Sequence, residues 1–332
     1  MPKTLAIYFS DSSPMGYPFN KSDYFESYQE IISDLENYGL KVFIVRGKSY
    51  LKNGRFKKGW RFIDGILKES KGEIRADLIF NRDDKNTIPA IHDCKIINQP
   101  EFDQLCVDKF KTFEAFPDIS PKTASINSFS EALKQIKKWQ LTSDDMIVLK
   151  KNFLTEGRGI FILPVKNIKQ ELYPDWKDVL IQEFLDGSIG IPRIVKGLHD
   201  LRINVINGKP INAFLRVPKK GSYLANISQG GSGLPVDLKS VPKKVFSLVK
   251  KINQKALQYY PVIYSADFMN SPQGYKLVEL NSRPGLLHHN DFKNLSRKSE
   301  FIKSSSATRR STQLPHRKFN DAIVKMLVEA VK

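Results

Sequence analysis

Two acidic residues and one asparagine near the C-terminal end have the spacing expected of a metal site. Asp267 lies in one apolar run and, beyond a Ser-Pro-Gln-Gly turn, Glu279 and Asn281 lie in the next. Residues two apart on a strand share a face, so Glu279 and Asn281 should project together, with Asp267 folded back beside them by the turn. Val278 and Leu280 are then expected to face the opposite side. Two carboxylates and an amide oxygen suit Mg²⁺, which shares its coordination shell with substrate phosphates, although a solvated hairpin at a sheet edge carries the same residue types.

Two lysines and a glycine-rich turn earlier in the chain are suited to bind phosphate. The apolar run 146–149 leads directly into Lys150 and Lys151, and a turn with Gly157 and Gly159 follows. A lysine at a strand end offers a point charge to phosphate oxygens, which the backbone N–H groups of a short glycine-rich turn can also approach. Because neighbouring strand residues face opposite sides, only one of the two lysines can reach the phosphates, and we expect it to be Lys150. Taken alone, Gly-x-Gly is more typical of an ordinary hairpin turn.

The next strand ends in a polar stretch that could border a nucleotide base. It runs from an apolar segment into Gln182, Glu183, Phe184 and Leu185. A flat base can stack on the apolar side of such a strand and form hydrogen bonds to the backbone at its end. A plain strand end gives the same pattern, so this stretch needs the support of other motifs.

A hairpin further along the chain adds charged residues and a loop suited to anions. An Asn-Gly turn joins two apolar runs, which is typical of a two-residue hairpin. Strand alternation puts Asp200, Arg202 and Asn204 on one face, and the returning strand carries Arg216. Arginine is suited to bidentate contacts with phosphoryl oxygens. The following loop holds Asn226 and a glycine-dense stretch whose backbone can wrap an anion.

The charge balance indicates an anionic partner without identifying it. Lys and Arg number 53 against 35 Asp and Glu, which gives a formal net charge of +18. Such an excess favours nucleotides, acidic substrates or nucleic acid, although a lysine-rich soluble surface accounts for much of it. Two cysteines, Cys94 and Cys106, are too few for a disulfide framework, and no run approaches the roughly 18 apolar residues of a membrane span. We therefore expect a soluble, cytoplasmic protein with no membrane partner.

Alternating strand and helix signals predict a parallel α/β sheet in the first hundred residues or so. The strands expected there are 5–9, 42–45, 77–80 and 95–97, with a helix at 23–38 and a projecting hairpin or loop at 50–60. A second α/β unit is expected at 122–185, with strands at 146–149, 160–163 and 179–184. The remaining predicted elements are a hairpin at 201–206 and 211–217, helices at 241–259 and 319–331, and the metal hairpin between them. Residues 293–318 form a basic segment with a Ser-rich, flexible-looking centre.

In their order along the chain, these motifs resemble those of the ATP-grasp superfamily, in the branch that contains ribosomal-protein glutamate ligases and glutathione synthetase. The resemblance covers residues 5–285, and the order and spacing are more specific than any single motif. The residues that carry it are Asp108, Lys109, Lys150, Gly157, Gly159, Gln182, Glu183, Phe184, Asp200, Arg202, Arg216, Asn226, Gly230, Gly231, Asp267, Glu279, Asn281 and Gly285. It implies an α/β pre-ATP-grasp domain at 1–101, an α+β ATP-grasp domain at 102–292 with a lid subdomain at about 120–186, and a basic segment with a C-terminal helix at 293–332.

The resemblance also implies a role for each motif. The implied cofactor-binding residues are Lys109, Lys150, Lys151, Gly157, Gly159, Gln182, Glu183, Phe184, Leu185, Asp200 and Arg216. Among them, 182–185 resemble an adenine hinge and Asp200 a ribose contact, and Lys151 is included because the loop up to Gly157 is longer than usual. The implied catalytic residues are Arg216, Asn226 and Lys150, and the implied ligands of Mg²⁺, or alternatively Mn²⁺, are Asp267, Glu279 and Asn281. The sequence departs from the family at Arg283, where a small residue is more usual.

The implied activity is an ATP- and Mg²⁺-dependent carboxylate–amine ligase that works through an acyl phosphate and releases ADP and phosphate. Its substrates would be the carboxylate of a small molecule or acidic peptide, and an amine acceptor. One alternative is an ATP-binding module without ligase activity. Another is a binder of nucleic acid or acidic protein built on the basic segment, which is not favoured because aromatic residues do not alternate with its charges. The oligomeric state is left open, with a homo-oligomer as one alternative.

Overall fold

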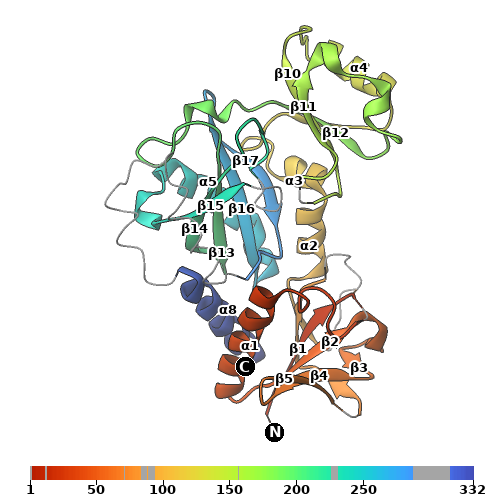
Figure 1. Cartoon of the computed structure of the whole chain (residues 1–332), viewed down its shortest axis with the longest axis vertical. Helices are drawn as coiled ribbons and strands as arrows, with labels where there is room; N and C mark the ends of the chain where they lie inside the picture. The colour runs from red at the N-terminus through yellow and green to blue at the C-terminus, as the bar shows by residue number, and fades with distance from the viewer. Residues whose placement is uncertain are drawn as a thin grey trace.

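The computed structural model describes residues 2–11, 13–70, 72–83, 88, 94–155, 157–225, 231–286 and 315–332. Figure 1 shows an N-terminal domain at one end of the molecule, a small lid at the other end, and a larger central sheet that lies beside the helices connecting them. The connecting helices are α2 (Pro100–Val107) and α3 (Lys109–Ala115). In the part of the chain that the structure describes, no helix is long and apolar enough to cross a bilayer.

The N-terminal sheet has the strand order β5-β4-β2-β1-β7-β8. The parallel strands are β1 (Thr4–Phe9), β2 (Lys41–Arg46), β7 (Leu78–Asn81) and β8 (Lys95–Ile97), and α1 (Ser22–Asn37) packs its apolar side against them. The parallel α/β sheet predicted from the sequence is confirmed. Covering one face with a helix buries the continuous apolar runs of these strands.

Residues 50–60 contain a turn that brings Tyr50 opposite Phe56, as the expected hairpin or loop requires, but the prediction that they project is wrong. The end of this segment enters β4 (Gly59–Ile63), which joins the sheet edge through Trp60 and Ile44 and continues as a hairpin into β5 (Ile66–Ser70). The short strands β3 (Arg55–Phe56) and β6 (Ile74–Arg75) form a separate pair. Phe56 and Trp60 are buried, so apolar packing holds this segment against the domain despite its basic residues.

The lid is an antiparallel sheet, which corrects the α/β unit expected at 122–185. Its strands are β9 (Thr123–Ile126), β10 (Met146–Lys151), β11 (Ile160–Pro164) and β12 (Val179–Glu183), in the order β11-β10-β12-β9. The connection between β10 and β11 is too short for the crossover of about a dozen residues that a parallel pair needs. One helix, α4 (Phe129–Lys138), covers the sheet, and its N-cap Ser128 accepts a hydrogen bond from the backbone of Glu131.

The central sheet is antiparallel, with the order β15-β14-β13-β16-β17. The strands are β13 (Asp200–Ile206), β14 (Lys209–Val217), β15 (Ser232–Val236), β16 (Ile263–Ser271) and β17 (Gly274–Asn281). Both predicted hairpins are present. Asn207 and Gly208 adopt φ of 50° and 77°, as the tight turn between β13 and β14 requires.

Two helices cover the central sheet. The amphipathic helix α5 (Lys243–Ala256) buries Val245 and Val249 against it. The last helix, α8 (Pro315–Val331), starts earlier than the expected residue 319 and packs against α1, β13 and β14. Its Leu327 shares one buried cluster with residues of the N-terminal domain and the central sheet. The N-terminal and central domains therefore have a common core.

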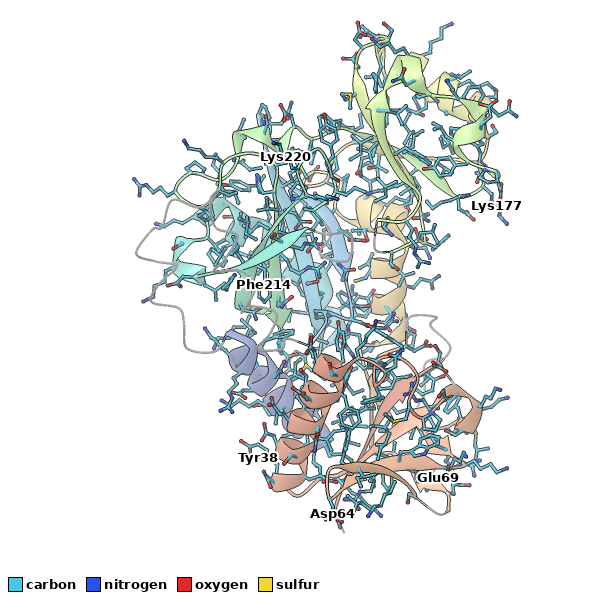
Figure 2. The ribbon with its side chains drawn as sticks, in the orientation of Figure 1. Tyr38, Asp64, Glu69, Lys177, Phe214 and Lys220 are labelled. Atoms are coloured by element: carbon cyan, nitrogen blue, oxygen red, sulfur yellow. The ribbon has the colours of Figure 1, made fainter. Side chains whose placement is uncertain are left out.

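Within the described ranges, the remaining regular structure consists of short 3-10 helices, which are η1 (Gly47–Ser49), η2 (Val165–Asn167), η3 (Gln170–Leu172), η4 (Gly187–Ile189), η6 (Leu238–Ser240) and η7 (Leu257–Tyr259). Charged side chains project outward on all three parts of the molecule, as Figure 2 shows for Asp64, Lys177 and Lys220. The basic segment 293–318 lies outside the described residues, except for its last four, which begin α8. Binding of nucleic acid or acidic protein by this segment stays an alternative.

Candidate functional site

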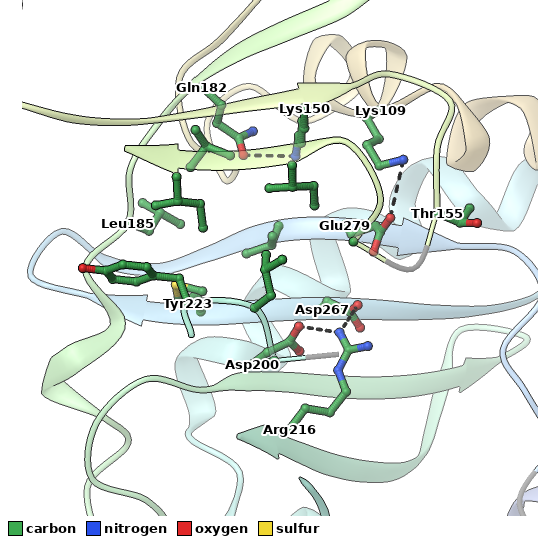
Figure 3. Close-up of a pocket in the computed structure, with 18 of the residues that line it drawn as sticks. Lys109, Lys150, Thr155, Gln182, Leu185, Asp200, Arg216, Tyr223, Asp267 and Glu279 are labelled. Carbon is green, nitrogen blue, oxygen red and sulfur yellow. Dashed lines mark hydrogen bonds and ion pairs between the residues drawn. The ribbon is translucent and has the colours of Figure 1, made fainter. Parts of the chain in front are cut away.

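A cavity of about 480 Å³ lies between the lid and the central sheet and contains most of the predicted site residues, as Figure 3 shows in close-up. Apolar side chains line it from both sides: Val148, Ile160 and Ile162 belong to the lid, and Leu198, Met269 and Val278 to the region of the central sheet. A slot between two apolar surfaces matches the shape and chemistry of an aromatic base.

The four residues predicted as an adenine hinge border this slot. Gln182, Glu183, Phe184 and Leu185 all line the cavity at the point where β12 ends. Phe184 packs edge-on against Tyr223, with 5.5 Å between the ring centroids. Tyr223 lies in the loop after β14 and had no periodicity to mark it in the sequence. It extends the aromatic border of the slot on the side of the central sheet.

Lys150 points into the cavity from β10. Its side chain is buried, and its Nζ donates a hydrogen bond of 3.0 Å to Oε1 of Gln182. The amide of Gln182 donates in turn to Oγ1 of Thr123 at 2.7 Å, which fixes the orientation of the pair. Burial lowers the pKa of Lys150 to about 8, with a further lowering by Lys109, although the negative charge of Glu279 opposes this shift. Lys150 is thus an amine whose charge changes near neutral pH.

Lys151 points to the other side of β10, as strand alternation predicts. Its Nζ donates to the backbone carbonyls of Asp175 and Lys177 at 2.5 and 2.6 Å and lies 5.5 Å from the ring centroid of Tyr173. It is therefore placed outside the cavity and already has partners. Of the two glycines, Gly157 lines the cavity, whereas Gly159 approaches the side chain of Lys151.

Lys109 lies in the first turn of α3, and its side chain enters the cavity at the end away from the hinge residues (Figure 3). Its Nζ donates to the carbonyls of Asn152 and Leu154 at 3.1 and 2.7 Å and lies 3.7 Å from Oε1 of Glu279. Asp108 caps the same helix and accepts a hydrogen bond from the side chain of Asn152. The helix start, the lid loop and β17 are thereby joined around one ammonium group.

Asp267 is completely buried and is bound by two arginines. Its Oδ1 accepts from Nε of Arg202 at 2.7 Å, and its Oδ2 accepts from Nη2 of Arg202 at 2.7 Å and of Arg216 at 2.6 Å. Burial alone would raise the pKa of Asp267, but the charges of Arg202 and Arg216 outweigh burial and lower it.

Asp200 shares Arg216 with Asp267 in an ion pair (Figure 3). Burial raises its pKa, and the charge of Arg216 only partly offsets that effect. Strand alternation correctly places Asp200 and Arg202 on the cavity side. The sequence motifs imply no separate role for Arg202, although its position two residues after Asp200 on the same strand face indicates that it borders the cavity. The result is a pair of guanidinium groups beside two carboxylates at the cavity wall.

A β-bulge shapes the predicted metal hairpin. The pairing of β16 with β17 shifts after Asp267, which lies opposite Glu279, while Phe268 lies opposite Leu277. Val278 is the extra residue, and it lines the cavity next to Glu279. The prediction that Val278 faces the opposite side is therefore wrong, because a bulge interrupts strand alternation and re-aims the side chains. Asn281 lies on the cavity side as predicted.

The residues around the bulge fit a hard cation. Asp267, Glu279 and Asn281 all line the cavity, and they offer the oxygen donors that Mg²⁺ favours. The buried Nδ2 of Asn281 has no hydrogen-bond partner within the described ranges, so the amide is not committed to a neighbouring side chain. Oδ1 of Asp267 accepts a single hydrogen bond, from Arg202, and so keeps a lone pair that could bind a metal ion. Within the same ranges, no three His, Cys, Asp or Glu residues gather as an alternative site.

Two residues of the cavity were not predicted from the sequence, and two residues that were predicted lie outside the described ranges. Tyr24 of α1 and Arg283 after β17 both line the cavity, although they are far apart in the chain. Only the packing of the N-terminal domain against the central sheet brings Tyr24 there. The predicted catalytic Asn226 and the neighbouring Gly230 lie outside the described residues.

The sequence of residues 108–303 matches the family of RimK-like ATP-grasp domains. Among curated relatives, the coenzyme gamma-F420-2:alpha-L-glutamate ligase of Methanocaldococcus jannaschii is 27% identical over 203 residues, which make up 59% of this chain and 64% of that protein. A probable alpha-L-glutamate ligase of Maridesulfovibrio salexigens is 27% identical over 136 residues, or 40% of each chain. The chain thus spans less than two thirds of the length of these relatives.

Solved structures with a similar fold include ATP-grasp ligases. The D-Ala:D-Ser ligase VanG of Enterococcus faecalis superposes with a TM-score of 0.63 at 12% identity. The superposition covers 100% of both chains. The ATP-grasp ligase PsnB, solved with a phosphomimetic variant of its minimal precursor, Mg and ADP, has a TM-score of 0.58 at 11% identity, again over 100% of both chains. These likenesses establish an ATP-grasp fold. Because the family match covers more than half of its residues, the chain belongs to the family of RimK-like ATP-grasp domains.

Proposed function

We propose that this protein is an ATP- and Mg²⁺-dependent ligase that joins a carboxylate to an amine. The observation that carries the proposal is the cavity between the lid and the central sheet, which brings cationic side chains and a hard-oxygen donor set to one place. Both are needed to activate a carboxylate with ATP, since two anions must approach each other in a partly enclosed site.

The roles follow from position and charge. In our proposal, Lys109, Lys150 and Arg216 bind the phosphates of ATP, because all three line the cavity and carry donors. The adenine ring occupies the apolar slot beside the hinge residues, and Gly157 approaches the phosphates through its backbone. Lys151 is assigned no contact with ATP, because its ammonium group is held outside the cavity by backbone carbonyls.

The proposed reaction has two steps. A carboxylate oxygen of the first substrate attacks the γ-phosphorus of ATP, the bond to the β,γ-bridging oxygen breaks, and ADP leaves. The amine of the second substrate then attacks the acyl carbon, loses a proton and displaces phosphate, so that an amide forms. Asp267, Glu279 and Asn281 would hold Mg²⁺, which when bound supplies charge neutralisation at the phosphoryl oxygens, and Mn²⁺ is the alternative metal. No covalent intermediate with the protein is required.

We further propose glutamate, or an acidic molecule that carries it, as one of the two substrates. The support is that the relatives described above are named as glutamate ligases. The other substrate would be a small molecule or an acidic peptide. We place the reaction in the cytoplasm, because both cysteines are buried and free, as expected in a reducing compartment.

The activity can be tested by the release of ADP. The purified protein, Mg²⁺ and ATP would be incubated with glutamate as the amine, paired in turn with mono-acids, di-acids and acidic peptides, and then with glutamate as the carboxylate paired with amines. We expect ADP and phosphate to form only when both substrates are present. Formation of AMP and pyrophosphate would contradict the proposed phosphoryl transfer.

ATP binding should weaken as the pH rises through about 8. The pKa of Lys150 is about 8, so the side chain is charged below this pH and neutral above it. If the charge is needed, the Kd for a non-hydrolysable ATP analogue should be about 10-fold higher at pH 9 than at pH 7, because roughly nine-tenths of the lysine is then neutral. Calorimetric titrations at several pH values measure this.

Lys150→Arg is the matched control, since arginine keeps its charge across the whole range. Its affinity should change little between pH 7 and pH 9. An equal pH dependence in the wild type and in Lys150→Met would show that another group is responsible.

A further inference from the structure

Strand β17, which carries Glu279 and Asn281, is called the metal strand below. Each residue of the backbone that follows it is held by the N-terminal domain or by helix α2. Asn281 ends β17, and each of the next five residues, Ser282 to Leu286, contacts a side chain from the first 103 residues of the chain. The contacts come from separate elements and include both neutral and charged groups. A loop that only connected two domains would not need this many anchors.

Asn98 holds the ends of both metal-site strands. It follows β8 and is 1% exposed. Its Nδ2 donates to the carbonyl of Ser282 at 2.5 Å and to the carbonyl of Ile263 at 2.6 Å, and its Oδ1 accepts from the backbone N–H of Ile263 at 2.9 Å. Ile263 begins β16, the strand that carries Asp267. One side chain of the N-terminal domain therefore links the start of β16 to the end of β17.

Arg283 is anchored by a buried carboxylate. Its Nη2 donates to Oδ2 of Asp103 on α2 at 2.7 Å, and Asp103 has no exposed surface. The same oxygen accepts from the side chain of Asn81 at 2.9 Å, where β7 ends. Through Asp103, the guanidinium group of Arg283 links the metal strand to α2 and to the end of β7.

The next three residues complete the attachment. Arg82 donates to the carbonyl of Pro284 at 2.8 Å and to the hydroxyl of Tyr28 at 3.1 Å. Gly285 lies against Tyr24, whose hydroxyl would be 3.0 Å from a Cβ at this position, a tighter contact than most side chains make. Leu286 is buried in the core shared with α1.

We propose that Asn98, Arg283 and Asp103 are positioning residues of the metal site, through which the N-terminal domain fixes Glu279 and Asn281 relative to Asp267. The inference rests on the proposed function, because it concerns the metal of that reaction. The bulge at Val278 lies on the turn side of the metal residues, whereas the pairing from Asp267 and Glu279 to Ser265 and Asn281 is regular. A constraint at this open end of the hairpin is therefore passed through regular strand pairs to Glu279 and Asn281. Groups that orient metal ligands without touching the metal commonly change its affinity by about 10–100-fold when they are removed.

Asn98 gives the cleanest test, because it is buried and does not line the cavity, so that its effect must pass through the backbone. The measurement is a calorimetric titration of Mg²⁺ into the protein saturated with a non-hydrolysable ATP analogue. Asn98→Ala should weaken Mg²⁺ binding by about 10–100-fold, while binding of the analogue in EDTA stays within about 2-fold of the wild type. Arg283→Met should act in the same direction, and Arg283→Lys should restore part of the loss because it keeps the charge but not the planar fork.

Two further variants keep the test decisive. Arg82→Met removes the anchor at Pro284 from a partly exposed side chain, and it should weaken Mg²⁺ binding even if Asn98→Ala does not fold. Lys95→Met is the matched control. Lys95 donates to the carbonyl of Ala330 at 2.8 Å, so it also links the N-terminal domain to another part of the chain, but it does not contact the metal strand. Its Mg²⁺ affinity should equal that of the wild type.

The outcomes separate the two proposals. If the wild type does not bind Mg²⁺ together with the ATP analogue, the proposed function fails and the positioning roles fail with it. If the wild type binds both and the folded Asn98, Arg283 and Arg82 variants bind Mg²⁺ as tightly as it does, only the positioning proposal is overturned. Equal losses in Mg²⁺ affinity and in metal-free nucleotide affinity would also overturn it, since they indicate a general loss of structure.

Discussion

Glu279→Gln is expected to lower Mg²⁺-dependent turnover by at least about 100-fold, because the change removes a metal-binding charge at the reacting phosphates. The two side chains have nearly the same volume, and Glu279 is partly exposed in the cavity, with Lys109 as its ion-pair partner at 3.7 Å. The melting temperature should therefore stay close to that of the wild type. Turnover as ADP release and thermal unfolding are the two measurements.

Glu69→Gln serves as the control for this change. Glu69 is an exposed residue of the N-terminal domain, where it pairs with Lys58 far from the cavity, and its loss should leave turnover unchanged. Near-normal activity of Glu279→Gln at ordinary Mg²⁺ concentrations would remove Glu279 from the metal site. A large fall in its melting temperature would instead assign the residue to the fold.

Lys150→Met should weaken ATP binding by about 10–100-fold, which corresponds to the roughly 1.5–3 kcal/mol of a hydrogen bond to a charged group. Methionine is similar in length and tolerates the apolar neighbours of Lys150 in the lid, so the sheet should remain intact. Calorimetric titration with a non-hydrolysable ATP analogue measures the change. Arg216 and Lys109 would still bind the phosphates of ATP, and they account for the affinity that persists.

Lys151→Met is the matched substitution on the adjacent residue. Because the ammonium group of Lys151 is bound to the carbonyls of Asp175 and Lys177 outside the cavity, we expect a small loss of stability and no change in ATP affinity. A larger loss of affinity for Lys151→Met than for Lys150→Met would reverse the assignment. The pair thus compares two faces of one strand with a single chemical change.

The sequence was sufficient to predict the direction of a side chain where strand alternation alone determines it. It predicted that Lys150 and Lys151 face opposite sides, and it placed Asp200 and Arg202 together on the cavity wall. These inferences depend on one strand at a time, and a period of two residues is a strong local constraint. The residues at the end of β12, for which the family resemblance implies a hinge, line the cavity, and their role in binding a base stays a prediction.

The sequence was not sufficient to predict features that depend on a partner strand or on another domain. The bulge at Val278 comes from the register between β16 and β17, which no pattern within β17 reveals. The lid strand β9 has the sequence Thr-Ala-Ser-Ile and is recognised only by its pairing with β12. The contact of Asn98 with Ser282 joins residues far apart in the chain, so it depends on the whole fold.

A crystal structure of the protein with Mg²⁺ and a non-hydrolysable ATP analogue tests the assignment of the cavity most directly. We expect the base in the apolar slot beside residues 182–185, the phosphates at Lys109, Lys150 and Arg216, and Mg²⁺ in contact with Asp267, Glu279 and Asn281. A nucleotide bound outside this cavity, or a metal ion held without any contact to Glu279, would contradict it.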